Sequence, residues 1–328
     1  MDRRRRRARA LGLLAALIGP LALIGSAALA ADAAPPPLRA MRWVPPDADP
    51  LRAFATTPAE CLRRPGGPDA ALAVEVGRAA FRTPVLLGGQ AARAGLSCES
   101  CHRAGRDNSD FQFPGASGAP GTADVTLSLF SSHRGNGVHD PKPIPDLSGP
   151  RDKLKVAPED LAPFIRGLIV EEFDGHEPPP AVLEGLAAYV RALDPAACPR
   201  PARVALSASG LIADAARALA AARAELARGD RPTAILMIAA ARARLGLIDE
   251  RYAGLAPERA RLRAADAGLS SLQAALRQAR PDAVAGLARA AAGLPALEAA
   301  LKPRHARSLF NPARLSYAHN RRLPAKPS

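Results

Sequence analysis

Cysteine is scarce in this sequence, and its scarcity limits what a cysteine-based site can be. Four cysteines occur among 328 residues. Cys98 and Cys101 are close together, but Cys61 and Cys198 lie far from them along the chain. A structural zinc site needs two further ligands at a matching spacing, so this distribution argues against zinc. Aromatic residues are also few, at 4% of the chain, and alanine is abundant, which suits packed helices better than sheets.

Acidic residues are in short supply as well, at 31 against 45 basic residues. Residues 199–328 hold 22 basic and nine acidic side chains, whereas residues 31–198 hold 17 basic and 21 acidic ones. A basic chain can bind nucleic acid, but here the excess lies at the two ends and the middle is mildly acidic. Nucleic acid is therefore not an expected partner. The length leaves room for about two domains.

The strongest functional signal is a run of five residues, Cys98-Glu99-Ser100-Cys101-His102. The pattern C-x-x-C-H is the attachment signature of a c-type haem. The two thiols form thioethers with the porphyrin, and the histidine that follows is the proximal ligand of the iron. A thioredoxin-type redox pair would need a βαβ setting, which the surrounding sequence lacks. The motif predicts one covalent haem c held by Cys98, Cys101 and His102.

The first thirty residues have the features of an export signal. Arginines from Arg3 to Arg7 precede an apolar core from Leu11 to Ile24, and small residues follow up to Ala30. The apolar stretch is nearly long enough to span a bilayer, so an uncleaved anchor is the alternative. Pro20 and the ending Ala-Leu-Ala favour cleavage after Ala30. Because covalent haem attachment of this kind occurs outside the bacterial cytoplasm, a periplasmic location is expected.

Residues 31–68 are rich in proline and alanine, which predicts an extended lead-in rather than a domain. Cys61 ends this lead-in, and Cys198 lies just past the last predicted helix of the haem region. In an oxidising compartment these two cysteines are expected to form a disulfide. It would close a long loop and stabilise the fold by up to about 5 kcal/mol. The alternative is two unpaired, buried thiols.

Residues 69–198 predict a helical haem domain. Apolar periodicity indicates helices from Asp69 through Phe81, from Ala157 to about Phe173, and from Pro180 to about Leu193. The segment from Phe111 to Ser148 has glycine and proline throughout and almost no periodicity, so it predicts a long loop. A loop of this length inside a domain is usually functional.

The order of helix, C-x-x-C-H motif, long loop and final helix resembles the class I cytochrome c domain. In that family a Gly and a Phe one turn apart on the first helix meet a Leu-x-x-aromatic pair on the last. The matching residues here are Gly77, Phe81, Leu186 and Tyr189. The family also has a proline twelve residues after the haem histidine whose carbonyl accepts the imidazole N–H, and Pro114 holds that position. The resemblance covers about residues 69–195 and implies an all-α, cytochrome c-like fold.

More narrowly, Val76 to His102 resembles the approach to a haem motif in bacterial dihaem cytochrome c peroxidases. This chain has one C-x-x-C-H where those proteins have two, so the second haem is missing. The usual methionine ligand is also missing, since no methionine occurs between Met41 and Met237. A histidine, a residue from outside the domain, or nothing then fills the distal position. The candidate histidines are His133, His139 and His176, with His133 first because its loop resembles the peroxidase pattern.

Residues 199–302 predict a basic helical bundle, because leucine and alanine recur every three or four residues. Four or so antiparallel helices are expected. A solvated helix face is the favoured interpretation of the densest basic cluster, and a docking surface for an acidic partner or an anionic membrane is the alternative. That cluster consists of Arg242, Arg244, Arg251, Arg259, Arg261 and Arg263. Residues 303–328 predict a loosely ordered tail.

These features together predict a periplasmic c-type cytochrome that carries electrons. The alternatives are a peroxidase-like haem enzyme with an open distal site and a haem-based sensor or scaffold. The charge of the bundle could dock it on the haem domain or on an acidic redox partner. Docking on a partner is favoured, because arginine-rich helices offer little apolar surface for an interface within the chain.

Overall fold

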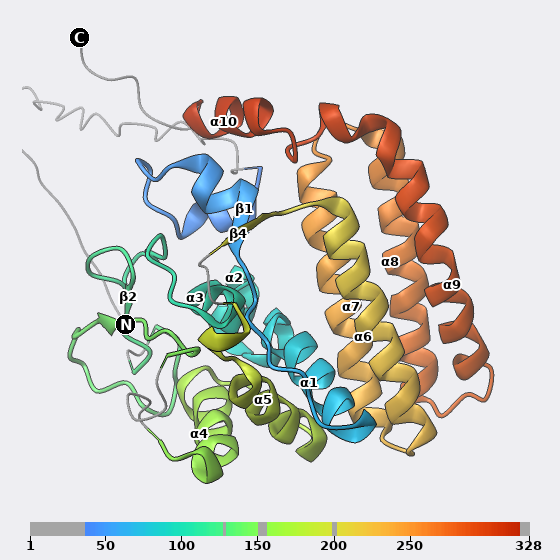
Figure 1. The fold of residues 1–328 in the computed structure, drawn as a ribbon, viewed down its shortest axis with the longest axis horizontal. Coiled ribbons are helices and arrows are strands. Elements are labelled where there is room, and N and C mark those ends of the chain that lie inside the picture. Colours follow the sequence, from blue (N-terminus) through green and yellow to red (C-terminus); the bar gives the residue numbers. More distant parts are fainter. Residues whose placement is uncertain (1–36, 127–128, 150–155, 199–201, 322–328) are drawn as a thin grey trace, which may run out of the picture. The chain divides into compact units, whose positions relative to one another are not determined.

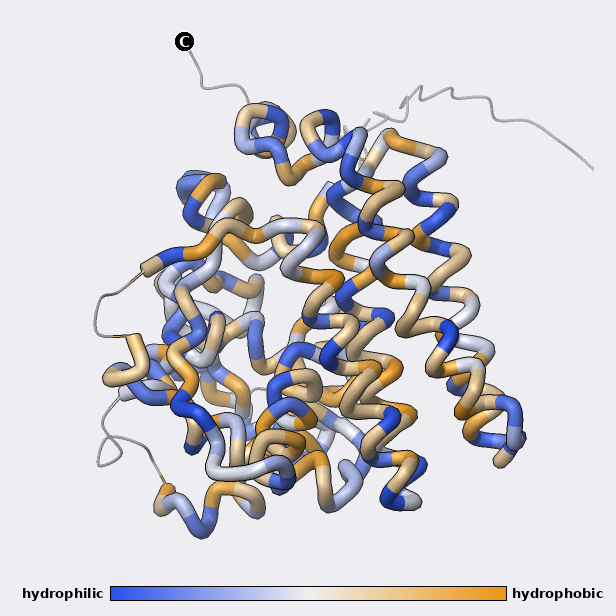
Figure 2. Tube along the Cα trace, turned by 45° about the vertical axis from the view of Figure 1, so that its right-hand side comes forward, coloured by the Kyte–Doolittle hydropathy of each residue, from blue (hydrophilic) through white to orange (hydrophobic). Residues whose placement is uncertain are grey.

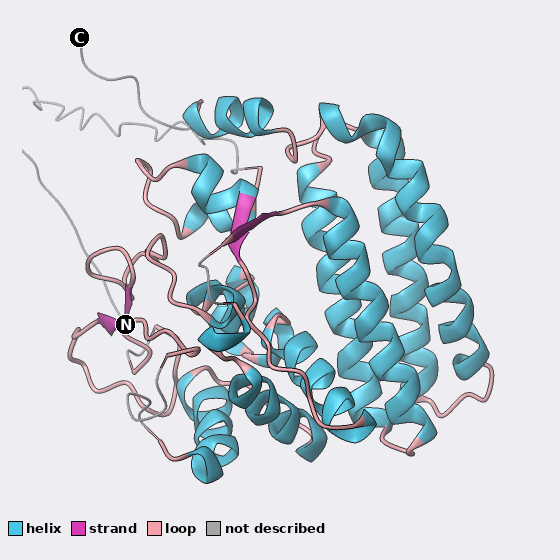
Figure 3. Cartoon of the chain, in the orientation of Figure 1, coloured by secondary structure: helices cyan, strands magenta, loops and turns pink. Residues whose placement is uncertain are grey.

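The computed structural model describes residues 37–126, 129–149, 156–198 and 202–321 (Figure 1). All of them belong to one unit by their mutual contacts. The predicted signal segment, residues 1–30 with its cleavage site after Ala30, lies outside the described residues. Helices dominate the described residues, in agreement with the predicted all-α class, and strands are few and short (Figure 3).

The helices predicted around the haem motif are present. The helix predicted from Asp69 is α1, and Pro68 occupies its first turn, where the missing N–H of proline costs nothing. The helix predicted from Ala157 to Phe173 is divided into a 3-10 turn, Pro158–Asp160, a helix α4 and a π-turn, Leu168–Glu172. The helices of this part are α1 (Pro68–Phe81), α2 (Gly89–Ala94), α3 (Cys98–Cys101), α4 (Leu161–Gly167) and α5 (Pro180–Ala192).

Helices α1 and α5 cross at two glycines. A Cβ atom added to Gly77 would lie 1.8 Å from the carbonyl oxygen of Gly185, so only glycine lets the two backbones come this close. One turn further on, the rings of Phe81 and Tyr189 pack with their centroids 5.1 Å apart. Val76, Phe81, Leu186 and Tyr189 are all buried. The predicted close approach of the first and last helices is therefore confirmed.

The long loop predicted from Phe111 to Ser148 is present and folds back on the haem motif. Within it a short hairpin pairs β2 (Thr122–Ala123) with β3 (Lys142–Pro143). The end of the loop reaches the motif, where the N–H of Leu147 donates to the carbonyl of Gly105 at 3.0 Å. This return brings residues 145–147 beside the haem motif.

The described part of the lead-in, residues 37–68, is not merely extended, which corrects the prediction for this part of residues 31–68. Met41, Trp43 and Phe54 are buried in the core, in and beside two helical turns, Arg39–Arg42 and Leu51–Ala55. The strand β1 (Thr56–Pro58) pairs antiparallel with β4 (Arg203–Ala205), just before the bundle. Proline content indicated an extended chain, but burial of the apolar side chains between the prolines gives this segment a packed structure.

The four predicted helices of the C-terminal region are confirmed and run side by side (Figure 1). Ser207 and Asp230 begin the first two, because their side chains accept hydrogen bonds from N–H groups of the first turn. Apolar and polar segments alternate along the helices (Figure 2). Of the described residues, only Ala283–Arg307 forms a helical stretch long and apolar enough to cross a membrane. The helices are α6 (Ala208–Ala227), α7 (Arg231–Arg251), α8 (Ala256–Arg277) and α9 (Ala283–Leu301).

Residues 303–321 are packed on the fold, which corrects the prediction of a loose tail for this part; residues 322–328 of the predicted tail lie outside the described residues. A 3-10 helix, Lys302–Arg307, leads to α10 (Pro312–Asn320). Leu315 is fully buried, and Nε2 of His319 lies 3.0 Å from the carbonyl oxygen of Pro46 in the lead-in. Because the apolar residues of this segment are widely spaced, the sequence did not show the packing that orders it.

The predicted disulfide is present between Cys61 and Cys198, whose Cα atoms are 5.2 Å apart. The two cysteines are separated by 137 positions in the sequence, and the loop that the bond closes contains the C-x-x-C-H motif. The backbone is paired at the same place, since the N–H of Asp194 donates to the carbonyl of Cys61. The bond therefore ties the lead-in to the segment that follows α5.

Replacing Cys61 and Cys198 together by serine is expected to lower the free energy of unfolding by up to about 5 kcal/mol, because the unfolded chain gains the freedom that the loop removes. Urea unfolding of the oxidised wild type and the double variant measures this. Digestion without reductant should release one cross-linked peptide pair, and covalent haem should stay attached after reduction. Free thiols at both positions in the oxidised protein would contradict the pairing.

Candidate functional site

Helix α3 is a single turn that carries both motif cysteines. Ser97 begins it: its backbone carbonyl accepts the Ser100 N–H at 2.9 Å, and its own N–H donates to the Ser100 Oγ at 3.0 Å. Residues three apart on a helix lie on the same face, so this cap presents Cys98 and Cys101 together. Both side chains are half-buried and pack against the hydrophobic core.

His102 follows the helix and is held by its Nδ1 atom. Nδ1 lies 3.0 Å from the carbonyl oxygen of Pro145. Since a carbonyl only accepts, Nδ1 carries the proton, and Nε2 of the neutral ring keeps its lone pair for a metal. The expectation that Pro114 accepts this hydrogen bond is wrong. Pro114 is exposed in a turn, and the returning loop brings Pro145 to the imidazole instead.

Burial governs the electrostatics of the motif. Desolvation lowers the pKa of His102 to about 4, against the opposing effect of the hydrogen bond to Pro145. Desolvation also raises the pKa values of Cys98 and Cys101 to about 12. In the chain by itself, the imidazole and both thiols are therefore neutral at pH 7.

Glu99, the residue after the first cysteine, is a part of the site that the sequence analysis missed. One carboxylate oxygen accepts the Ala104 N–H at 3.2 Å, and the other accepts from Nε of Arg82 at 3.3 Å. Ala104 has a positive φ of 54°, a conformation that is uncommon outside glycine. Glu99 thus holds the turn that follows His102 and ties it to α1. No signal in the sequence marks this role, because the position is variable in the C-x-x-C-H pattern.

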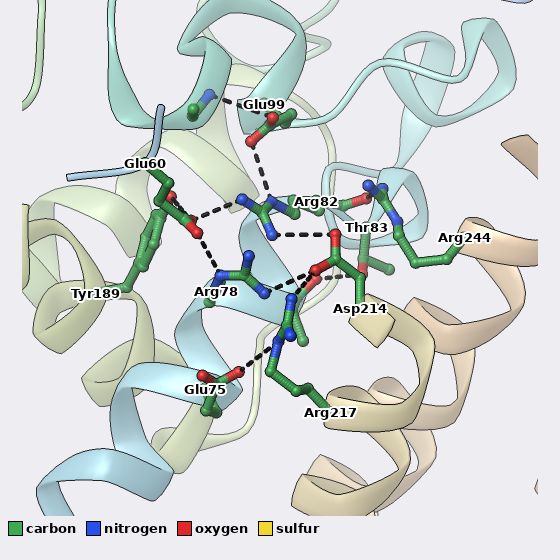
Figure 4. Close-up of polar contacts among 12 residues, drawn as sticks. Glu60, Glu75, Arg78, Arg82, Thr83, Glu99, Tyr189, Asp214, Arg217 and Arg244 are labelled. Atoms are coloured by element: carbon green, nitrogen blue, oxygen red, sulfur yellow. Dashed lines mark hydrogen bonds and ion pairs between the residues drawn. The ribbon is translucent and has the colours of Figure 1, made fainter. Parts of the chain in front are cut away.

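Arg82 and Arg78, at the end of α1, lie in a buried network of charges (Figure 4). Glu60 of the lead-in accepts from both guanidinium groups at 2.6 Å and from the hydroxyl of Tyr189 at 2.7 Å. Asp214 of α6 pairs with Arg78 at 2.9 Å and with Arg82 at 3.3 Å. The network therefore connects the lead-in, the haem motif, α5 and the bundle.

The pKa shifts in this network follow from burial and neighbouring charge. Burial alone would raise the pKa of Asp214, but Arg82, Arg78, Arg217 and Arg244 together hold it below the usual value. Burial lowers the pKa of Arg244 to about 10, with a further contribution from Arg82. Asp214 is therefore ionised at neutral pH, and its charge offsets those of the buried arginines.

Two arginines of the basic cluster are buried, so the favoured interpretation of a solvated face is wrong for them. Arg244 donates to the backbone carbonyl of Arg82, and Arg251 donates to that of Phe54 at 2.6 Å. Arg242 and Arg259 pair with aspartates inside the bundle. A long arginine can bury its stem and still satisfy its guanidinium with carbonyls, which residue counts do not reveal.

The same contacts show that the bundle packs within the chain, and its docking on a redox partner stays a prediction. Helices α6 and α7 pack on α1, so the bundle docks within the chain. The sequence favoured docking on a partner because an internal interface needs apolar surface. Here ion pairs between Asp214 and the arginines at the end of α1 form part of the interface. Removal of the bundle would therefore leave these buried arginines without one of their counter-charges.

The three candidate distal histidines are all exposed. Nδ1 of His133 lies 3.1 Å from a carboxylate oxygen of Asp174 and 3.3 Å from the Ser132 hydroxyl. His139 lies in the same loop. No described hydrogen bond or ring contact joins His133, His139 or His176 to His102.

Four aromatic side chains form a row that ends next to His133 and Asp174. Ring centroids are 6.4 Å apart for Trp43 and Phe113, 5.2 Å for Phe113 and Phe130, and 5.5 Å for Phe130 and Phe173. Phe130 precedes the Ser131–His133 segment, and Phe173 precedes Asp174. The aromatic row therefore anchors both halves of the His133–Asp174 pair.

The described residues contain no group of three or more His, Cys, Asp and Glu side chains arranged to hold a metal ion. The two cysteines outside the motif are bonded to each other. Comparison of the chain with protein-family models, curated proteins and solved structures finds no match.

Proposed function

We propose that this chain is a periplasmic monohaem c-type cytochrome that carries electrons. The observation that supports it best is the Nδ1 hydrogen bond of His102 to Pro145, directly after a turn that presents two cysteines. In this arrangement Cys98 and Cys101 would hold the porphyrin, and Nε2 of His102 would be the axial ligand. A haem bound there supplies a one-electron Fe(III)/Fe(II) couple.

The residues around the motif fit a covalent haem. The thiols are half-buried against the apolar core, as thioether links to a macrocycle require. Phe81 lies beside the imidazole, with ring centroids 6.4 Å apart. Pro145 fixes the tautomer of His102, and Glu99 holds the turn that follows it. The chain therefore orients the imidazole of His102 before any redox change.

Replacing both Cys98 and Cys101 by alanine is expected to abolish covalent haem, because no thioether link then remains. The measurement is haem staining after denaturing electrophoresis, with the intact mass, in a bacterial strain that matures c-type cytochromes. The matched control replaces Cys61 and Cys198 by serine and should retain covalent haem. A wild-type protein matured in that strain without covalent haem would refute the proposed function.

A second function, a peroxidase-like enzyme, is favoured by the pair His133–Asp174. A carboxylate on Nδ1 orients a histidine and leaves its Nε2 for a metal or a proton. If His133 were the sixth ligand, it would occupy the remaining coordination position of the iron, which supports electron transfer. As a base beside an open site, it would support peroxide turnover.

Replacing His133 by alanine is expected to change the ferric spectrum from low to high spin, because it removes the sixth ligand in the electron carrier. Alanine at His139 or His176 is the matched control and should leave the spectrum unchanged. The wild type should lack the methionine charge-transfer band. If the wild type shows such a band and Met41→Leu loses it, the distal ligand is instead Met41 of the lead-in. High-spin wild-type haem with peroxide turnover would favour the enzyme.

A further inference from the structure

Helices α7, α8 and α9 leave between them a groove that the proposed electron carrier does not use. Its volume of about 390 Å³ lies within the range of small-molecule sites, roughly 300–1,000 Å³. The leucines that line it are Leu245, Leu269, Leu272, Leu294 and Leu297. An apolar groove of this size excludes water from whatever occupies it, which favours a ligand with an apolar part.

Two glycines keep the groove open. A Cβ atom added to Gly268 of α8 or to Gly293 of α9 would meet no atom within 4 Å. By contrast, a Cβ on Gly286 of α9 would lie 2.4 Å from a methyl carbon of Leu272, so close packing explains that glycine. Glycine is unfavourable inside a helix, and at 268 and 293 no close approach compensates for it. The absence of a side chain at these two positions therefore leaves space in the groove.

Arg289 gives the groove a charge. Of the described residues that line it, Arg289 alone is charged. No carboxylate within the described residues pairs with its guanidinium, although most other arginines of α7 and α8 have such a partner or a backbone carbonyl. Residues 199–328, with 22 basic and nine acidic side chains, add to the positive potential. The groove therefore complements an anion attached to an apolar body.

We propose that this groove binds a free single-chain anionic amphiphile of the fatty-acid type. The alkyl tail lies on the leucine floor, and the carboxylate meets the Arg289 guanidinium at the edge of the groove. A charged hydrogen bond at one end and apolar contact along the rest give both affinity and orientation. The proposal does not depend on the haem.

Binding of dodecanoate to the full-length mature protein, measured by calorimetry and by displacement of a fluorescent fatty acid, tests this proposal. Dodecanol, with the same tail and no charge, should bind roughly tenfold more weakly. Arg289→Gln should weaken dodecanoate binding by a similar factor. Arg223→Gln is the matched control, because Arg223 is an exposed arginine of α6 outside the groove lining, and it should bind like the wild type.

Filling the groove provides a second test. Gly268→Leu and Gly293→Leu should abolish dodecanoate binding while the helical content and the melting temperature stay the same or rise, since leucine favours a helix. The proposal would be overturned by no dodecanoate binding by the wild type, by undiminished binding by both leucine variants, or by equal binding of dodecanol. A dimer of this chain that the leucine variants disrupt would overturn it too. Binding only to anionic vesicles, unaffected by Gly293→Leu, would also overturn it in favour of a membrane surface.

Discussion

Replacing Asp214 by alanine is expected to lower the free energy of unfolding by about 3–5 kcal/mol, as does removal of one partner from other buried ion pairs. Asp214 pairs with Arg78 and Arg82, whose side chains are only 13% and 8% exposed. Without it, two buried guanidinium groups lose a counter-charge that water cannot replace. Urea unfolding followed by circular dichroism measures the difference.

The matched control is Asp282→Ala. Asp282 pairs with Arg280, but these side chains are 60% and 56% exposed. Water screens that pair, so its loss should change stability by less than about 1 kcal/mol. Equal effects of the two replacements would contradict the conclusion that buried charges anchor the bundle on α1.

The same network gives a pH dependence. The pKa of Asp214 is lower in the fold than its usual 3.8, because the surrounding arginines outweigh the effect of burial. A lowered folded pKa contributes stability above the unfolded pKa, and this is lost as the pH falls through the folded pKa. Wild-type stability should therefore fall more than that of Asp214→Asn between neutral pH and the acid range. Parallel curves for the two proteins would contradict this assignment.

Replacing Gly77 by alanine is expected to cost about 3 kcal/mol or more, at the upper end of overpacking effects. The new methyl group would lie 1.8 Å from the carbonyl oxygen of Gly185, and backbone cannot move aside as a side chain can. Helices α1 and α5 must separate, which removes Phe81 of α1 from Tyr189 of α5. Thermal unfolding and the yield of covalent haem measure the result.

Gly167→Ala is the matched control. Gly167 is also helical, but a Cβ there would meet no atom within 4 Å. Alanine should leave stability unchanged or raise it by about 0.5–1 kcal/mol, because it favours the helix. If Gly77→Ala were as stable as Gly167→Ala, the close crossing of α1 and α5 would be wrong.

The amino-acid order by itself determined the helices and the motif. Apolar periodicity located α1, α5 and the four bundle helices, since a helix that buries one face must repeat apolar residues every three or four positions. The same local logic located Cys98, Cys101 and His102, because attachment and ligation need those side chains at fixed short spacing. Two leftover cysteines, in a chain whose first residues predict export, were enough to predict the disulfide.

Only the tertiary structure decided contacts between residues far apart in the chain. The partner of His102 proved to be Pro145 rather than Pro114, because the path of a loop without periodicity leaves no regular trace in sequence. The packed structure of the lead-in and the tail was not predicted for the same reason. It depends on a few buried residues, such as Phe54 and Leu315, that show no periodicity. The composition of a segment indicates its local conformational preference. The lead-in and the tail are instead ordered by contacts with residues far away in the sequence.

The arginines show most clearly the difference between what the sequence determines and what the fold determines. Residue counts located an excess of arginine in residues 199–328, but they could not distinguish an exposed guanidinium from the buried ones of Arg244 and Arg251. The difference depends on whether a carbonyl or carboxylate from a distant segment lies within hydrogen-bonding distance. The sequence thus determined that the bundle is helical and basic. The fold decided that it docks on α1, because only there do Arg78 and Arg82 meet Asp214 away from water.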